Sequence, residues 1–190
     1  MKKSLQNNEY RLDSIIYYRW DTIKNNWIIR DKDIYAYDVD QNRKSRINYY
    51  YDTIANQWEE TLKWEYNFDA NDKDTLSVIY FWDTNTTDWL KWMKTKYSLD
   101  ANGNDTLHMD YTWDIIAKEW KVAGKTENTF DANGNLTLII NYNWNKGEGD
   151  WEYWHKWEYS YDASGKLTLS MSYIWNTDAS DWVKRTKREY

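Results

Sequence analysis

Apolar and aromatic residues alternate with polar ones over several stretches of this chain. In residues 167–175, LTLSMSYIW, leucine, methionine, tyrosine and tryptophan occupy every second position, and residues 136–144 repeat the pattern. A period of two is typical of a β-strand with one buried face. A polar loop, NKGEGD, follows at 145–150, and aromatic residues alternate again in 151–161. Together these stretches predict a β-hairpin.

The hairpin pattern recurs every 31 residues. Five aspartates keep this step: Asp38, Asp69, Asp100, Asp131 and Asp162. Two aromatic series keep it as well: Trp20, Tyr51, Trp82, Trp113, Trp144 and Trp175, and then Trp27, Trp58, Trp89, Trp120, Trp151 and Trp182. A fixed period without insertions is typical of a repeat array. We therefore predict a polar lead at residues 1–8, and six tandem hairpin repeats at 9–190 that form one all-β, antiparallel domain of about twelve strands.

The stretch FDANGNLTL, residues 130–138, has the alternating oxygen ligands of a calcium loop. An EF-type loop has glycine at its sixth position and glutamate at its twelfth. Counted from Asp131, however, the glycine is fourth and the twelfth residue is Tyr142. The composition suits a type I turn that is followed by a left-handed glycine. We interpret the stretch as a hairpin turn; in the third copy Asp72 replaces the glycine, and in the second Gln41 does.

One charged column occurs in every copy: Lys32, Lys63, Lys94, Lys125, Lys156 and Lys187. Strict alternation places it on the face opposite the paired tryptophans, where it could bind an acidic polymer such as a polysaccharide. Alternatively, the lysines pair with nearby Glu65, Glu127, Glu158 or Asp110 on a solvated face. Trp92 and Trp154 interrupt this polar face at equivalent positions. They are candidates for stacking on sugar rings, or else incidental surface aromatics or a contact with another chain.

A meander of twelve strands can close into a barrel, curl into an open spiral or fold into a sandwich. We expect a closed or nearly closed barrel-like sheet, with an open superhelical or single-layer sheet as the alternative. Lys184 and Arg188 argue against closure, because inward-pointing charges protect an edge strand. If the first strand, 12–20, paired with the last strand, 182–190, between molecules, the chain would associate with itself.

Composition argues against several classes of protein. The chain has no cysteine and a formal charge of −6 without a basic patch, so neither thiolate chemistry nor nucleic-acid binding is expected. No apolar run approaches the roughly 18 residues of a membrane helix, and the N-terminus lacks a signal-peptide pattern. His108 and His155 occupy non-equivalent positions and are expected on opposite faces. We therefore predict no enzyme, no catalytic or metal residues and no cofactor.

The segments YSYDASGKLTL and NTFDANGNLTL resemble the YD repeats of Rhs-type bacterial surface proteins. The tryptophan- and asparagine-rich form is similar to secreted repeat proteins of the Bacteroidetes. The resemblance implies hairpins in long sheets that spiral round a hollow interior, and an extracellular or cell-surface location. It favours a structural or adhesive module that works as scaffold, spacer or filament subunit. A carbohydrate-binding array is the alternative.

Overall fold

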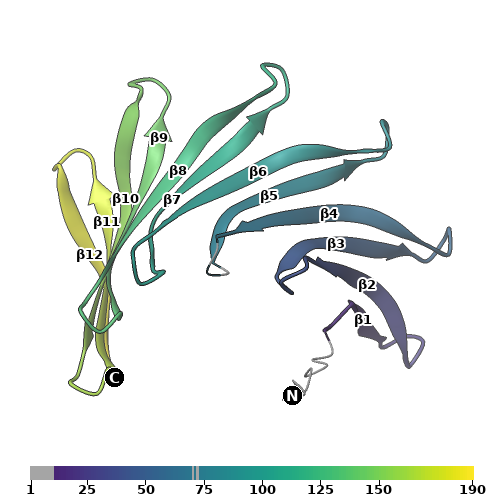
Figure 1. Cartoon of the computed structure of the whole chain (residues 1–190), viewed down its shortest axis with the longest axis horizontal. Coiled ribbons are helices and arrows are strands. Elements are labelled where there is room, and N and C mark those ends of the chain that lie inside the picture. Colours follow the sequence, from purple (N-terminus) through teal and green to yellow (C-terminus); the bar gives the residue numbers. More distant parts are fainter. Residues whose placement is uncertain (1–10, 70, 72) are drawn as a thin grey trace, which may run out of the picture. The chain divides into compact units, whose positions relative to one another are not determined.

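The computed structural model of the chain describes residues 11–69, 71 and 73–190. The predicted polar lead at 1–8 and the glycine replacement Asp72 lie outside these residues. Within the described part the chain forms strands joined by turns, and no helix occurs (Figure 1). The predicted all-β class is therefore confirmed.

Twelve strands follow one another in a single sheet, in the order in which they occur in the sequence. Their bounds are β1 Ser14–Asp21, β2 Asn26–Tyr37, β3 Arg43–Asp52, β4 Gln57–Phe68, β5 Asp74–Asp83, β6 Asp88–Leu99, β7 Asp105–Asp114, β8 Glu119–Phe130, β9 Leu136–Asn145, β10 Asp150–Tyr161, β11 Leu167–Asn176 and β12 Asp181–Glu189. The antiparallel meander is confirmed.

The sheet is not closed, because the strand order begins at β1 and ends at β12. The expectation of a closed barrel is therefore wrong, and the alternative of an open sheet holds. Strand β12 has solvent-exposed side chains over most of its length, including Lys184 and Arg188. These charges can remain hydrated on an unpaired edge, whereas closure would have to desolvate them.

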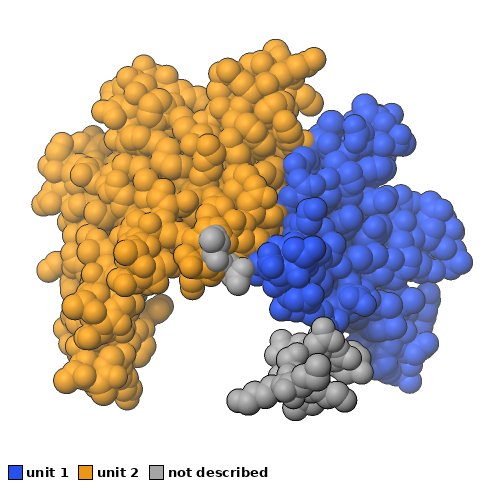
Figure 2. All heavy atoms as spheres, in the orientation of Figure 1, with its two compact units in different colours: residues 1–65, 80–90 blue, residues 66–79, 91–190 orange. Residues whose placement is uncertain are grey.

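The chain divides into two compact units, which Figure 2 shows in different colours. Unit 1 comprises the described part of residues 1–65 together with 80–90, and unit 2 comprises the described part of 66–79 together with 91–190. Strands β1–β3 belong to unit 1, and β7–β12 belong to unit 2. The prediction that residues 9–190 form one domain stays a prediction.

An extra residue interrupts the alternation in β2, β4, β8, β10 and β12. In β10, Tyr153 pairs with Tyr142 but His155 pairs with Asn141, so that Trp154 is left over as a β-bulge. Equivalent bulge residues occur in β2, β4, β8 and β12: Arg30, Thr61, Ala123 and Arg185. Because side chains alternate between faces, one additional residue moves every later side chain to the other face.

The bulge overturns two expectations about faces. Lys156 pairs with Ile140, and Trp151 pairs with Trp144. Ile140 and Trp144 are four residues apart in β9, so their side chains point to the same face of the sheet. The lysine column thus lies on the face that carries the tryptophan pairs, here called the Trp face, and not on the opposite one. His155 moves in turn to the opposite face, where the pairing of His108 with Thr126 places that histidine too. The two histidines therefore share a face.

The DANGN segments form the predicted turns. The amide of Gly134 donates to the carbonyl of Asp131 at 3.0 Å, and Gly134 has a φ of 82°. One carboxylate oxygen of Asp131 accepts the amides of Asn133 and Asn135, each at 2.9 Å. The side chain that resembled a calcium ligand is therefore occupied in fixing the turn. Gln41 adopts the same left-handed conformation, with a φ of 73°.

The sheet has little buried core. Among the described residues only Tyr173, Asp33 and Thr126 are buried. Paired aromatic rings flank the odd-to-even hairpin loops instead, as for Trp144 and Trp151, whose ring centroids lie 5.0 Å apart in an edge-to-face arrangement. Such pairs contribute about 0.5–1.5 kcal/mol each beyond their buried area. Cross-strand contacts thus stabilise this sheet in place of a dry interior.

Candidate functional site

The lysine column forms a repeated contact, here called the lysine–aromatic cluster. Each cluster takes a lysine from one copy, and a tyrosine and a tryptophan that follow it by 17 and 26 residues in the next copy. In three copies a glutamate two residues after the lysine completes the cluster. The five lysines with both rings are Lys32, Lys63, Lys94, Lys125 and Lys156.

The cluster around Lys125 shows the full geometry. The Lys125 ammonium lies 3.9 Å from the ring centroid of Tyr142 and 5.4 Å from that of Trp151. It also contacts Glu127 at 2.8 Å, and the Tyr142 hydroxyl donates to the other oxygen of the same carboxylate at 2.7 Å. Only 17% of the Lys125 side chain is exposed. Two cation–π contacts and a charge-assisted hydrogen bond thus hold the ammonium group.

The environment fixes the charge of these groups at neutral pH. Burial and the hydrogen bond to Glu127 raise the pKa of Tyr142. Burial would raise the pKa of Glu127, but the hydrogen bonds from Lys125 and Tyr142 outweigh it, so that this pKa is lowered. In the next copy the hydrogen bond to Glu158 raises the pKa of Tyr173 to about 12. The carboxylates stay charged and the tyrosines neutral near pH 7, which does not suit general acid–base catalysis.

The remaining copies vary the cluster. Lys32 has both rings, but Ile34 stands at the position of the acid. Beside Lys94 that position holds Lys96, and burial together with the charges of Lys96 and Lys91 lowers the pKa of Lys94. The cluster therefore tolerates loss of its carboxylate, and the rings are its constant part.

The predicted lysine sites thus have structural partners. The expected pairing with Glu65, Glu127 and Glu158 is present at 2.8–3.0 Å. Asp110 has a different partner, because its carboxylate accepts the hydroxyl of Thr95 at 2.7 Å. Lys187 differs from the others: it pairs with Glu189, and 57% of its side chain is exposed. Binding of a polysaccharide to this column stays a prediction.

The two candidate tryptophans are accessible. Trp92 is 45% exposed and Trp154 is 47% exposed. Trp154 is the bulge residue of β10, and Trp92 occupies the equivalent place in its copy. The ring of His155 packs 4.3 Å from that of Trp154 and 5.5 Å from that of Trp157.

A buried ion pair in unit 1 was missed by the sequence analysis. Asp33 has no exposed surface; it accepts hydrogen bonds from Tyr17 and Asn48 at 3.0 Å and pairs with Arg46 at 2.8 Å. Burial would raise the pKa of Asp33, but the hydrogen bonds from Asn48, Arg46 and Tyr17 outweigh it and the pKa is lowered. A carboxylate within a strand that is to be buried requires a partner. The identity of the partners depends on the register between neighbouring strands, which the sequence alone does not predict.

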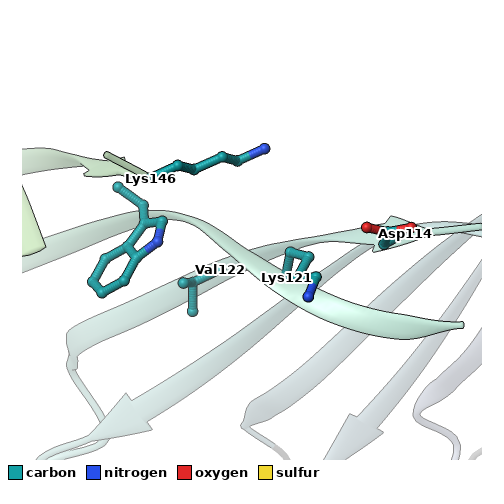
Figure 3. Close-up of a pocket in the computed structure, with 5 residues that line it drawn as sticks. Asp114, Lys121, Val122 and Lys146 are labelled. Atoms are coloured by element: carbon teal, nitrogen blue, oxygen red, sulfur yellow. The ribbon is translucent and has the colours of Figure 1, made fainter. Parts of the chain in front are cut away.

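One cavity near a hairpin loop of unit 2 has a volume of about 350 Å³ and is shown in Figure 3. It is lined by Asp114, Lys121, Val122, Trp144 and Lys146. A cavity of about 380 Å³ in unit 1 includes the residues 93 positions, or three copies, earlier: Ile28, Ile29, Tyr51 and Thr53.

The hollow is therefore a recurring feature of the repeat, whereas its chemistry changes from copy to copy. The Asp114 carboxylate in Figure 3 accepts the amides of Ile116 and Ala117 at 3.0 and 2.9 Å. The hydrogen bond from Ala117, above all, lowers its pKa. This carboxylate is therefore held by its own turn, in the charged form that the lowered pKa favours.

The described residues contain no group of three or more histidine, cysteine, aspartate or glutamate side chains that could hold a metal ion. His108 contacts one carboxylate, that of Asp105, at 2.9 Å. In the same part of the chain no helix is long and apolar enough to span a membrane.

Comparison with known proteins shows the fold. No family model matches the chain, and no curated protein matches it. A protein of unknown function from Bacteroides fragilis superimposes with a TM-score of 0.58 at 21% identity, over 67% of this chain and 91% of that one. A DUF3836 family protein from Bacteroides vulgatus gives 0.44 at 16% identity, over 51% and 98% of the two chains. The likeness shows the fold alone. The resemblance to YD repeats stays a prediction.

Proposed function

We propose that this chain is a non-enzymatic structural module, a scaffold or spacer of an extracellular or cell-surface protein. The resemblance to YD repeats supports the location. The lysine–aromatic cluster carries the functional part, because the same side chains meet at five successive junctions between copies. A catalytic centre needs one asymmetric set of groups. Here the charged groups that recur are engaged in holding neighbouring copies together.

The cavities support the same proposal. Equivalent hollows in copies one and four are lined by different residues, such as Ile28 and Lys121 at one place in the repeat. The feature that recurs between consecutive copies is the contact of a lysine with a tyrosine and a tryptophan. In a repeat array stability is a sum over such nearest-neighbour contacts.

Removal of one whole copy tests this proposal. Deleting residues 105–135 removes 31 residues and brings Leu136 to the place of Asp105, its equivalent in the period. A scaffold should still fold, and its m-value in urea should fall by about one sixth, because that value scales with the surface exposed on unfolding. A deletion of residues 105–119, which breaks the period, is the matched control and should prevent folding. If both deletions unfold the chain, the copies do not act as interchangeable units.

Carbohydrate binding is the second candidate, and the exposure of Trp92 and Trp154 favours it. Soluble glycans that stack on these rings would change tryptophan fluorescence in a saturable way. Trp92→Ala and Trp154→Ala should then abolish the change, while Trp113→Ala, in a paired position, should keep it. The structural proposal expects no saturable change with any glycan of a broad panel.

A further inference from the structure

Each lysine–aromatic cluster joins two consecutive copies, and the two edges of the sheet carry the two halves of such a cluster. The edge strand β12 supplies Lys187 and Glu189, at the positions that Lys156 and Glu158 occupy one copy earlier. The first copy supplies Tyr18 and Trp27 on β1 and β2. These two residues are at the positions that Tyr49 and Trp58 occupy one copy later, in the cluster of Lys32.

Both halves are exposed, unlike their internal equivalents. Tyr18 is 53% exposed and Trp27 is 61% exposed, and together with Ile16 and Tyr17 they line a groove of about 570 Å³. The side chain of Lys187 is 57% exposed, whereas those of its equivalents in complete clusters with glutamate are 16–19% exposed.

The internal junctions define how the two halves would meet. Between β10 and β11, Lys156 pairs with Tyr173 and Glu158 pairs with Met171. Advancing this register by one period opposes Lys187 to Tyr18 and Glu189 to Ile16. The Tyr18 hydroxyl would then donate to Glu189, as that of Tyr173 donates to Glu158.

Charge favours contact between unlike ends. Strand β12 carries four cations, Lys184, Arg185, Lys187 and Arg188, against two anions, Asp181 and Glu189, whereas β1 carries one of each, Arg19 and Asp21. Two such strands would repel each other, whereas β1 offers tyrosine rings to them. The continued register sets Arg188 opposite Tyr17, next to Lys187 opposite Tyr18, so that two cations meet two aromatic rings.

We propose that β12 of one molecule pairs antiparallel with β1 of a second copy of this chain, with Lys187 entering the groove of Tyr18 and Trp27. This junction rests on the proposed structural function and names the partner of its edges. It joins unlike surfaces, so that each dimer keeps one free end of each kind for further copies.

The test is sedimentation velocity over a wide range of protein concentration. The wild type should grow in mass with concentration, and Trp27→Ala and Lys187→Met should each weaken association at least tenfold. Each variant keeps one intact end. An equimolar mixture should therefore form a 1:1 heterodimer that grows no further, through Lys187 of the first variant and Trp27 of the second. Lys125→Met, in an internal cluster, should associate like the wild type.

A wild type that is monomeric at every concentration would overturn the junction, and so would association that Lys187→Met leaves unchanged. A mixture without heterodimer would overturn it as well. Urea unfolding of Trp27→Ala verifies that this variant is folded. Lys187→Met is a second, independent test of the junction, because the side chain of Lys187 is exposed and its replacement should leave the fold intact. Failure of the junction leaves the structural function standing. Conversely, a wild type that associates as expected but also binds glycans saturably would support the junction and contradict the structural function.

Discussion

The lysine–aromatic cluster predicts a specific loss of stability when its cation is removed. In Lys125→Met the side chain keeps its length and apolar stem but loses the charge. Cation–π contacts at 3.9 Å to Tyr142 and 5.4 Å to Trp151 contribute about 0.5–1 kcal/mol each. The pair with Glu127, whose side chain is 45% exposed, adds about 0.2–1 kcal/mol after screening by solvent. Part of this total is offset, because burying methionine does not carry the desolvation cost of the lysine ammonium group. We therefore expect the free energy of unfolding to fall by about 1.5 kcal/mol.

Urea unfolding followed by far-ultraviolet circular dichroism measures this loss, at a protein concentration at which the chain is monomeric. The matched control is Lys187→Met, which removes the equivalent lysine on the edge strand β12, where 57% of its side chain is exposed. It should change the free energy of unfolding by less than about 0.5 kcal/mol, as is usual for exposed pairs. Equal losses in the two variants would refute the reasoning. So would an unchanged Lys125→Met, because the lysine would then be free for a different role.

Three further predictions concern single residues. Gly134→Ala should destabilise the chain by about 1 kcal/mol: an added Cβ finds free space, but the φ of 82° is unfavourable for alanine. Gly124→Ala, within β8, should be neutral or stabilising by up to about 0.5 kcal/mol. The urea midpoints of the two variants test this difference. Asp33→Ala should cost about 3 kcal/mol by leaving Arg46 partly buried without its anion, and the added change Arg46→Met should recover part of that loss in a double-mutant cycle. Because the pKa values of Asp33 and Glu127 are lowered in the fold, they stabilise it above their usual values of 3.8 and 4.5. Thermal unfolding should show this stability falling as the pH drops below about 4, and a flat profile from pH 6 to 2 would contradict it.

The features that the sequence predicts well are local or strictly periodic. The turn at Asp131 depends on a few neighbouring residues, whose side-chain and backbone preferences are local properties. The meander follows from alternation and from the 31-residue period, which leaves each copy no partner but its neighbours. The packing of His155 is local in the same sense, because its ring partners Trp154 and Trp157 are close to it in the chain.

The bulge was not predictable from one sequence. Its positions carry residues as different as Arg30, Thr61, Ala123 and Trp154, so that no composition marks it. A bulge is a property of the pairing between strands, since it adds one residue to one strand only. Its effect is large, because the face of every later residue is inverted. For the same reason the Asp33–Arg46 pair could not be assigned, although the need for a partner was visible.

The position of the bulge explains why lysine recurs in every copy. If the strands alternated regularly, the column would lie on the face opposite the tryptophans. The bulge instead turns each lysine toward rings of the next copy, where an aliphatic stem packs and the ammonium meets a tyrosine and a tryptophan. In three of the five clusters a glutamate two residues after the lysine also holds the ammonium group. Within the sheet the lysine column therefore contacts rings of neighbouring copies, and its one exposed member, Lys187, lies on the edge strand β12.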